Sequence, residues 1–478
     1  MNDMHLTDFI ELEVQSLASD GRAVAKTPDG MAVFVQDALP GQRVLARVLR
    51  KKKNFAEAQV HAVLQSSPRE RPAPCPHAGL CGGCPWQKLP YGDQLSWKKD
   101  ILWQALRRIG RLGISREDIS DPLFPAADGA PLEWGCRNKM EFCFAPGEDG
   151  GTVLGLRQRA SHKAADIRSC LLQTPRTMRV LSELRRLCAE HGLGAAPQGI
   201  SGRAAPSRGI LRFAVIREPG SGQCLAELIT LPSPAHEKAL EDIGKALLAS
   251  GCGATGFVHS VRAEGASVAY GTPRFSCGNT ILEETLAVDG RDLTLRLGHA
   301  SFFQVNSRGA EILYNAAASA AKAMFGTDGR WGGQCWDIYC GAGGLALSLA
   351  QHFSSVRGME ISREAVELAR QNALSNFPHG PDFHFEAGDA ALLERFFARF
   401  GCPDLLVTDP PRAGMDSRVT QAILRHLPPK LLLISCDPGS LARDLGLLSS
   451  AYRICSIQPV DLFPQTPHIE TVAALTTH

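Results

Sequence analysis

The sequence has no long hydrophobic run and no marked excess of charge of either sign. Its apolar stretches are short, and residues 1–20 carry acids where a secretory leader would have a basic start and a hydrophobic core. We therefore expect no signal peptide, no membrane span and a cytoplasmic location. The net charge of +2 predicts no particular partner. At 478 residues the chain exceeds what one hydrophobic core organises, so we expect two or three domains.

Cysteine, by contrast, is abundant, with 15 in a chain that has no export signal. Such cysteines act as thiols, metal ligands or nucleophiles more often than as disulfides. The stretch CPHAGLCGGCPW places Cys75, Cys81 and Cys84 in a loop rich in glycine and proline that could wrap a bound group. A site of four ligands needs one more residue, and we expect Cys170, with His77 as its competitor. The spacing by itself fits zinc and iron-sulfur sites alike.

The N-terminal part reads as a small barrel followed by a linker and a helix. Residues 8–64 contain short strand patterns separated by glycine-rich turns, which predicts a β-barrel. The basic run at residues 47–53 indicates either a phosphate-facing surface or an ordinary solvated strand. Residues 66–77 are rich in proline and polar residues, as linkers are. Apolar residues then recur at helical spacing over 93–113, and we expect this helix to pack on the C-terminal domain.

From about residue 310 strand and helix patterns alternate, which predicts a doubly wound, mostly parallel sheet. Ligands of such sheets bind beyond the carboxyl ends of the strands, so the polar residues at those ends should converge. The glycine-rich turn after Asp337 would let the backbone approach a ligand closely. Glu360 would accept hydrogen bonds from ribose hydroxyls, and Asp389 would lie near an adenine edge. Together these features predict an adenosine-containing cofactor.

The last strand ends carry residues suited to covalent chemistry. The loop DPPR brings Asp409 and Arg412, and the stretch ISCDPG places Cys436 directly after a buried strand. A thiol in that position is either a buried structural cysteine or a covalent nucleophile. Glu470, preceded by His468, opens the final strand beside the same crevice and could act as a general base. The meeting of these groups at one rim favours the catalytic interpretation.

Five motifs together resemble the RNA uracil-5 methyltransferases that use S-adenosylmethionine. They are SFFQVN with Gln304, DIYCGAG at 337–343, DPPR at 409–412, SCDP around Cys436 and PHIETV around Glu470. The resemblance covers nearly the whole chain, and residues 8–64 resemble the TRAM domain that precedes the members acting on 23S ribosomal RNA. It implies a TRAM, OB-like all-β barrel over 1–66, a central α+β iron-sulfur domain over 67–300 and a Rossmann-like class I methyltransferase domain over 301–478.

The resemblance also implies roles for individual residues. Cys436 would add to carbon-6 of the uracil so that carbon-5 can accept the methyl group, and Glu470 would remove the carbon-5 proton. Two positions depart from the commonest pattern, because Gly344 replaces a frequent asparagine and Asp437 replaces the asparagine of SCNP. The implied cofactor contacts are Gln304, Tyr339, Gly344, Glu360, Asp389 and Asp409, and the implied ligands of a [4Fe-4S] cluster are Cys75, Cys81, Cys84 and Cys170.

The leading interpretation is a monomeric enzyme that methylates one flipped-out or single-stranded uridine of 23S ribosomal RNA. A transfer-RNA methyltransferase with the same chemistry is the first alternative, and the barrel and the cysteine loop count against it. A catalytically silent RNA-binding protein is the second, and the intact Cys436, Asp409 and Glu470 count against that. Methylation of cytosine would use the same nucleophile, but such enzymes place proline where this chain has Ser435.

Overall fold

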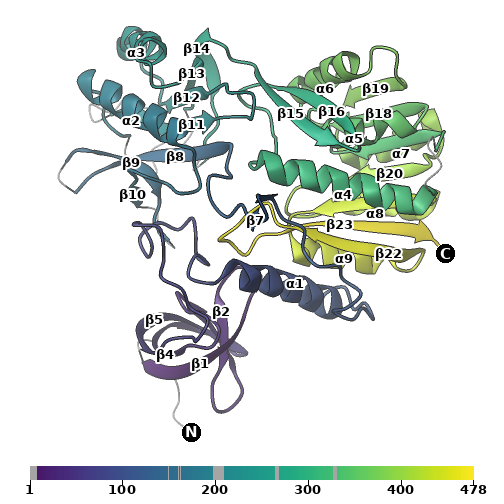
Figure 1. The fold of residues 1–478 in the computed structure, drawn as a ribbon, viewed down its shortest axis with the longest axis horizontal. Helices are drawn as coiled ribbons and strands as arrows, with labels where there is room; N and C mark the ends of the chain where they lie inside the picture. The colour runs from purple at the N-terminus through teal and green to yellow at the C-terminus, as the bar shows by residue number, and fades with distance from the viewer. Residues whose placement is uncertain are drawn as a thin grey trace.

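The structure, a computed structural model, describes residues 8–148, 150–159, 161, 163–196, 209–263, 268–326 and 331–478. Figure 1 shows the N-terminal barrel at the bottom, a central sheet above it and a C-terminal sheet beside the central one. Within the described ranges no helix has the length and apolar character needed to cross a membrane. A long helix, α1, lies between the barrel and the C-terminal sheet.

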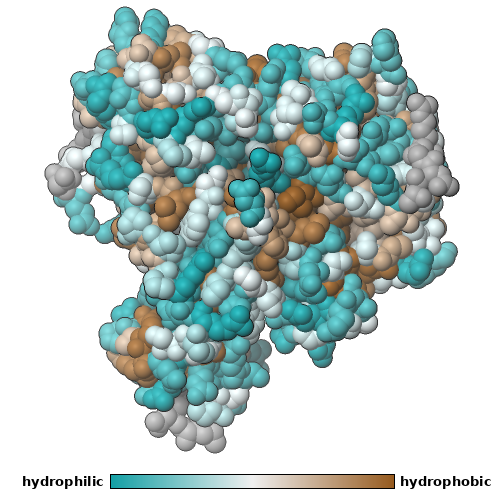
Figure 2. Space-filling model, in the orientation of Figure 1, coloured by the Kyte–Doolittle hydropathy of each residue, from teal (hydrophilic) through white to brown (hydrophobic). Residues whose placement is uncertain are grey.

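The predicted barrel is confirmed, and its five strands close in the order β1-β2-β3-β5-β4. Alternate side chains such as Val33, Val35 and Val44 point inward and are buried, as the period of two in the sequence requires. The basic run that the sequence places at 47–53 lies largely at the surface. Figure 2 shows hydrophobic side chains on the barrel surface as well. The strands are β1 (Phe9–Leu17), β2 (Ala23–Lys26), β3 (Ala32–Gln36), β4 (Arg43–Lys51) and β5 (Phe55–Gln65).

Helix α1 (Tyr91–Arg108) packs on the C-terminal helix α9 (Pro438–Leu448). It starts two residues before the expected helix at 93–113 and ends five residues earlier. Just beyond the helix the chain turns at Arg111, whose backbone is left-handed with φ of 54°. Gly110 lies so close to α9 that a Cβ there would be 2.6 Å from the carbonyl oxygen of Ala442, which only glycine allows.

The central part is a seven-stranded sheet in the order β10-β9-β8-β11-β12-β13-β14, with α2 and α3 packed against it. Most of its pairs are antiparallel, and only β12 and β13 run parallel. A small ribbon, β6 (Ala126–Ala127) with β7 (Ala130–Pro131), precedes it. Its elements are β8 (Lys139–Pro146), β9 (Thr152–Arg157), β10 (Ala164–Asp166), α2 (Pro175–Glu190), β11 (Leu211–Arg217), β12 (Leu225–Thr230), η1 (Pro234–His236), α3 (Glu237–Ala249), β13 (Gly256–Val261) and β14 (Thr272–Gly278).

A hairpin of β15 (Leu282–Val288) and β16 (Arg291–Leu297) follows the central sheet. It packs on α4 (Ser307–Phe325) and α6 (Arg363–Asn376) and shares their hydrophobic core. By packing, the hairpin therefore belongs with the C-terminal sheet, although its sequence position lies within 67–300.

The predicted doubly wound sheet is confirmed, with the order β19-β18-β17-β20-β21-β23-β22. Helices α4, α5 and α6 share the core on one face, and α1, α7, α8 and α9 share the core on the other. Strands β17 to β21 are parallel, whereas β23 is antiparallel to β21. The remaining elements are β17 (Gln334–Ile338), α5 (Gly344–Leu349), η2 (Ala350–His352), β18 (Ser355–Glu360), β19 (Asp382–Ala387), η3 (Ala390–Leu392), α7 (Leu393–Phe400), β20 (Leu405–Thr408), α8 (Ser417–His426), β21 (Lys430–Ser435), β22 (Tyr452–Val460) and β23 (Glu470–Thr477).

Candidate active site

The sheet topology brings Cys436 and Glu470 to the same rim. Strand β21 ends at Ser435, which pairs with Thr471 of the antiparallel strand β23. One residue beyond this pair, Cys436 leaves β21 and Glu470 enters β23, so the two side chains belong to neighbouring strand ends. Both line a pocket of about 720 Å³. A thiol and a carboxyl group from two different strands thus share one cavity.

Every residue that the sequence analysis proposed for cofactor binding or catalysis lines this same pocket. Asp337, Tyr314 and Arg412 line it too, together with exposed apolar side chains such as Phe302 and Ile361. The proposed residues are Gln304, Tyr339, Gly344, Glu360, Asp389, Asp409, Cys436 and Glu470.

Three buried carboxyl groups give the pocket its electrostatic character. Burial, followed by the negative Asp409 and Glu360, raises the pKa of Asp337 to about 8. The backbone N–H of Ala346 opposes that rise, but neither oxygen of Asp337 accepts a hydrogen bond of normal geometry from the described residues. Burial raises the pKa of Asp409 to about 6, and burial with Asp409 raises the pKa of Glu470 well above its ordinary value. Such a pocket would stabilise a positively charged ligand.

Burial likewise raises the pKa of the Cys436 thiol, to about 12. The negative Glu470 and Asp409 add to the rise, and Arg412 opposes it. The following residue, Asp437, caps helix α9 by accepting a hydrogen bond of 2.8 Å from the Ser440 amide. Asparagine and aspartate both cap helices well, so the departure from the SCNP pattern keeps the cap. In the ligand-free pocket Cys436 is therefore a protonated thiol at neutral pH.

This protonation state makes a testable prediction for alkylation by iodoacetamide. Because only the thiolate reacts, and its fraction grows about tenfold per pH unit below the pKa, the alkylation rate of Cys436 should keep rising through the alkaline range. A positively charged ligand beside Asp409 should lower the pKa and speed the reaction unless it covers the thiol. Peptide-resolved mass spectrometry measures this, with the exposed Cys455 as an internal control. A rate that reached its plateau near neutral pH would contradict the raised pKa.

The glycine-rich turn after β17 is shaped by contacts within the pocket wall. The amide of Gly341 donates a hydrogen bond of 3.2 Å to Glu360 Oε2, while Glu360 Oε1 accepts one from Ser362. Tyr339 holds a left-handed backbone with φ of 75° at the start of the turn. A Cβ added at Gly344 would lie 2.7 Å from the hydroxyl oxygen of Tyr314. Glycine replaces the more frequent asparagine there because Tyr314 fills the space that a side chain would need.

Arg412 and His468 form a contact at the mouth of the pocket. The guanidinium Nη2 lies 2.8 Å from His468 Nδ1. Burial and the positive Arg412, Lys98 and Arg137 lower the pKa of His468 to about 4. The imidazole is thus neutral, and because arginine can only donate, Nδ1 accepts. His468 therefore fixes Arg412 near Cys436 and does not act as a cationic acid.

Sequence reasoning missed the pocket residue Tyr314 and also Asn138, which lies outside the pocket lining and supports the loop of Gln304. Tyr314 is the one aromatic residue in the middle of an alanine-rich helix, LYNAAASAAKA, and such a lone bulky residue is a usable signal. Asn138, far away in the chain, donates hydrogen bonds of 3.0 Å to the carbonyl of Gln304 and 2.8 Å to Ser307 Oγ. It ties the loop carrying Gln304 to the central sheet. Nothing in its local sequence points to that contact.

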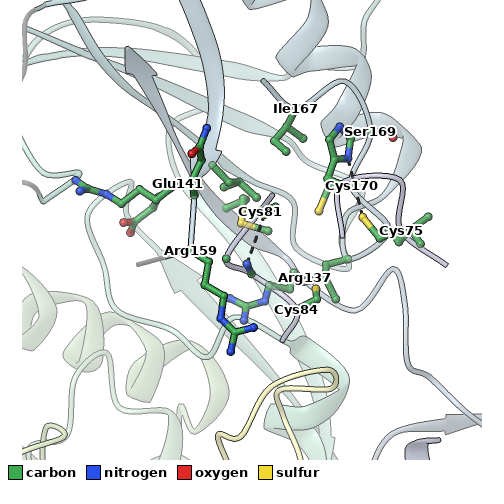
Figure 3. A pocket seen from close by; sticks show the side chains of 18 of the residues that line it. Cys75, Cys81, Cys84, Arg137, Glu141, Arg159, Ile167, Ser169 and Cys170 are labelled. Atoms are coloured by element: carbon green, nitrogen blue, oxygen red, sulfur yellow. Dashed lines mark hydrogen bonds between the residues drawn. The ribbon is translucent and has the colours of Figure 1, made fainter. Parts of the chain in front are cut away.

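A second cavity, of about 550 Å³, is lined by Cys75, Cys81, Cys84 and Cys170. Figure 3 shows these four side chains around it, with Arg137 and Glu141 nearby. Burial raises the pKa of Cys84 to about 12, and Cys170, Cys81 and Cys75 raise it further, in that order. His77 also lines the cavity, with Nδ1 4.0 Å from Cys75 Sγ. In the part of the chain that the structure describes, no group of three or more histidine, cysteine or acidic side chains forms a site for a metal ion.

Comparison with known proteins identifies the family. Residues 271–478 match the tRNA (uracil-5-)-methyltransferase family and residues 8–61 match the TRAM domain. An uncharacterized RNA methyltransferase of Nitratidesulfovibrio vulgaris is 40% identical over 98% of this chain and 95% of its own length. Another, from Halalkalibacterium halodurans, is 33% identical over 98% and 97%.

Among solved structures, the tRNA (uracil-54, C5)-methyltransferase of Pyrococcus abyssi in complex with S-adenosyl-L-homocysteine has the same fold. Its TM-score is 0.72 at 24% identity, and the match covers 98% of this chain and 100% of that one. With a family match over residues 271–478, a TRAM barrel and relatives that align over nearly the whole chain, the chain belongs to the RNA uracil-5 methyltransferases.

Proposed function

We propose that this enzyme transfers a methyl group from S-adenosylmethionine to carbon-5 of a uridine in 23S ribosomal RNA, through a covalent bond between Cys436 and the base. The observation that carries the proposal is the meeting of Cys436 and Glu470 at one rim of an acid-lined pocket. The residue roles that the resemblance implied are part of this proposal.

The pocket suits S-adenosylmethionine by charge and by shape. This cofactor supplies a methyl group on a positively charged sulfur. The buried Asp337 and Asp409 would stabilise its positive groups, because both have raised pKa values and Asp337 lacks a full hydrogen-bond partner among the described residues. Glu360 at the end of β18 and Asp389 at the end of β19 would hold the ribose and the adenine. Gly344 has no side chain to contact the cofactor, so the neighbouring Tyr314 would make that contact instead.

Replacing Asp337 by asparagine tests this assignment. Because the folded-state pKa of Asp337 is raised from 3.8 to about 8, its charge destabilises the ligand-free protein increasingly as the pH rises through that window. The melting temperature of Asp337→Asn should therefore exceed that of the wild type at alkaline pH, and the difference should shrink toward pH 3.8. Affinity for S-adenosylhomocysteine, measured by calorimetry, should fall about tenfold because a charge-assisted contact is lost. Unchanged affinity would remove Asp337 from the binding site.

Cys436 would begin the reaction as a thiolate, after its proton is released to solvent once the positively charged cofactor lies beside Asp409 and lowers the thiol pKa, and its sulfur would add to carbon-6 of the uracil. The addition turns the ring into an enolate, so carbon-5 becomes nucleophilic enough to accept the methyl group. Glu470 would then remove the proton from carbon-5, and the electron pair of that bond would expel the Cys436 thiolate from carbon-6. The raised pKa of Glu470 suits a base that must hold a proton after removing it.

The four cysteines of the second cavity are proposed to hold a [4Fe-4S] cluster. Cys75, Cys81, Cys84 and Cys170 line one cavity of about 550 Å³, and as thiolates they would be the ligands of the cluster. The mutual effects of the thiols on the pKa of Cys84 support their proximity. No step of the methyl transfer involves this cavity.

The identity of the fourth ligand can be tested by metal content. Cys170→Ser should lose most of the iron and the visible absorption of anaerobically purified protein, because only three thiolates remain. His77→Ala should keep both, although His77 lies near Cys75. The reverse pattern would make His77 the ligand, and zinc in place of iron in the wild type would remove the cluster from the proposal.

Transfer RNA remains the second candidate substrate. The solved Pyrococcus abyssi enzyme is a tRNA methyltransferase whose match covers 98% of this chain, barrel included. A barrel therefore does not by itself exclude a transfer RNA target. The 23S proposal depends on the resemblance of the combined barrel and cysteine loop to the ribosomal branch.

The deciding experiment supplies labelled S-adenosylmethionine and the anaerobically purified enzyme with ribosomal RNA and, separately, with bulk transfer RNA. Nucleoside analysis should find label as 5-methyluridine in large-subunit RNA. Label in transfer RNA alone would replace the proposed target, and label in cytidine would overturn the proposed base. The variant Cys436→Ala, treated identically, gives the background.

A further inference from the structure

The segment 461–469, which connects β22 to β23 and ends directly before Glu470, is a loop with an unusually buried set of polar groups. Asp461 and Gln465 are both 0% exposed, and Thr466 is 4% exposed. Loops normally lie at the surface, because buried backbone and side-chain polar groups need partners. The side-chain partners of Asp461 and Gln465 outside the loop come from segments that precede it by more than 300 residues.

An ion pair with α1 fixes the start of the loop. Lys98 Nζ lies 2.7 Å from Asp461 Oδ1 and 2.9 Å from the carbonyl oxygen of Phe463. Tyr91, about two turns earlier on the same face of α1, donates a hydrogen bond of 2.9 Å to Asp461 Oδ2. The side chains of Lys98 and Asp461 are both fully buried. A buried pair of this kind holds one geometry, because separating the charges without water is costly.

A pair of glutamines fixes the middle of the loop. Gln465 has a left-handed backbone with φ of 69° and donates its amide N–H to Gln94 Oε1 at 2.8 Å. In return Gln94 Nε2 donates to Gln465 Oε1 at 2.8 Å. Gln465 Nε2 also donates to Glu133 at 2.9 Å. A non-glycine residue keeps such a backbone only where its surroundings over-determine it. We call four of these side chains the loop anchor: Gln94, Lys98, Asp461 and Gln465.

The barrel and the cysteine loop both reach the anchored segment. The backbone N–H of Trp86 donates to the carbonyl of Gln465 at 3.0 Å, and its indole donates to the carbonyl of Gly21 in the barrel at 3.3 Å. A Cβ at Gly21 would lie 2.9 Å from Pro467, so the turn between β1 and β2 touches the loop. Gln87, which follows Trp86 in the chain, accepts a hydrogen bond of 3.2 Å from the Cys75 amide and so links the cysteine loop to this contact.

We propose that the loop anchor positions Glu470 against the reacting base, and that it couples the seating of the barrel and the cysteine loop to proton removal. The anchor acts on Glu470 more than on Cys436. Cys436 is held by the end of β21 and by the Asp437 cap of α9, whereas Glu470 is the first residue after the anchored loop. Loosening the anchor should therefore impair removal of the carbon-5 proton while leaving attack by Cys436 intact. The inference rests on the proposed function.

The test compares Gln94→Ala with wild type in a single turnover on RNA with labelled S-adenosylmethionine, resolving the covalent protein–RNA adduct on a denaturing gel. Gln94 touches neither the pocket nor its proposed ligands. If Glu470 is misplaced, release of the product from the adduct should slow by about 10- to 100-fold. The adduct should therefore accumulate, as it should for Glu470→Gln run beside it. Lys99→Ala on the same helix, whose side chain pairs with Asp121 and not with the loop, is the matched control and should behave as wild type.

Slower turnover without accumulated adduct would overturn the proposal. It would mean that attack by Cys436 and removal of the carbon-5 proton are slowed together, as in a general loss of folding. Unchanged turnover would overturn the proposal as well. Where Gln94→Ala does not fold, Gln465→Gly serves instead, since glycine accepts the left-handed backbone and only the side-chain bonds are lost. If wild type turns over and Glu470→Gln traps the adduct while the anchor variants do not, the proposed role of the loop anchor is wrong and the proposed function stands. If wild type forms no 5-methyluridine, the proposed function itself fails.

Discussion

Replacing Cys436 by alanine is expected to abolish methyl transfer while leaving the cofactor pocket intact. Without the sulfur, carbon-5 of the uracil has no route to an enolate, so turnover should fall by roughly 10⁴-fold or more. Affinity for S-adenosylhomocysteine should stay within about twofold, because the proposed cofactor contacts lie at or just after the ends of β17, β18, β19 and β20 and in the loop before α4. Nucleoside analysis gives the first quantity and calorimetry the second.

The matched control is Cys455→Ala, which removes an exposed thiol from β22 on the same sheet. It should keep wild-type turnover and binding. Substantial 5-methyluridine formation by Cys436→Ala would rule out the covalent route. Loss of cofactor affinity in the same variant would instead indicate that the substitution disturbs the pocket.

Replacing Glu470 by glutamine should separate the two chemical steps. The amide cannot remove the carbon-5 proton, so the methylated base should stay bound to Cys436 and turnover should fall by about 10²- to 10⁴-fold. The folded protein should be at least as stable as wild type. The pKa of Glu470 is raised by burial and by Asp409, so its charge lowers stability as the pH rises, and a neutral amide removes that effect. A denaturing gel detects the adduct, and thermal melting gives the stability.

The exposed Glu283 on β15 provides a control with the same chemical change. Glu283→Gln should release product normally and show no stable adduct. If Glu470→Gln formed product at the wild-type rate, another group would have to be the base. A fall in turnover with neither adduct nor loss of stability would place Glu470 before the covalent step.

Sequence reasoning could bring the candidate residues to one place because the fold concentrates them at strand ends. Parallel strands deliver the residues that follow them to one edge, so Glu360, Asp389, Asp409 and Cys436 could be assigned to one crevice before any coordinates. Glu470 reaches the same edge of the sheet because β23 runs antiparallel to β21 and therefore starts beside the end of that strand. The close approach of Gly110 to α9 was not predictable, because it depends on how α1 packs on α9.

Sequence periodicity does not reveal contacts between segments that lie far apart in the chain. Asn138 meets the loop of Gln304 across the boundary between two sheets. Gln94 looks like an ordinary polar position on an amphipathic helix, yet it is fully buried against a loop 371 positions away. The hairpin of β15 and β16 reads as part of a strand-rich region, and only its packing on α4 assigns it to the C-terminal core. Such pairings follow from tertiary packing, which no local pattern encodes.

The position of β23 has a consequence for the order in which the molecule becomes active. This strand follows all the other described strands in sequence, yet it lies between β21 and β22 and completes the sheet only by inserting between them. β22 and β23 pair as a hairpin, but Glu470 reaches the neighbourhood of Cys436 only when β23 also pairs with β21. The pocket walls formed by the parallel strands β17 to β20 do not need this insertion. Binding of the cofactor and completion of the site around Cys436 should therefore be separable during folding, with the second requiring β23 between β21 and β22.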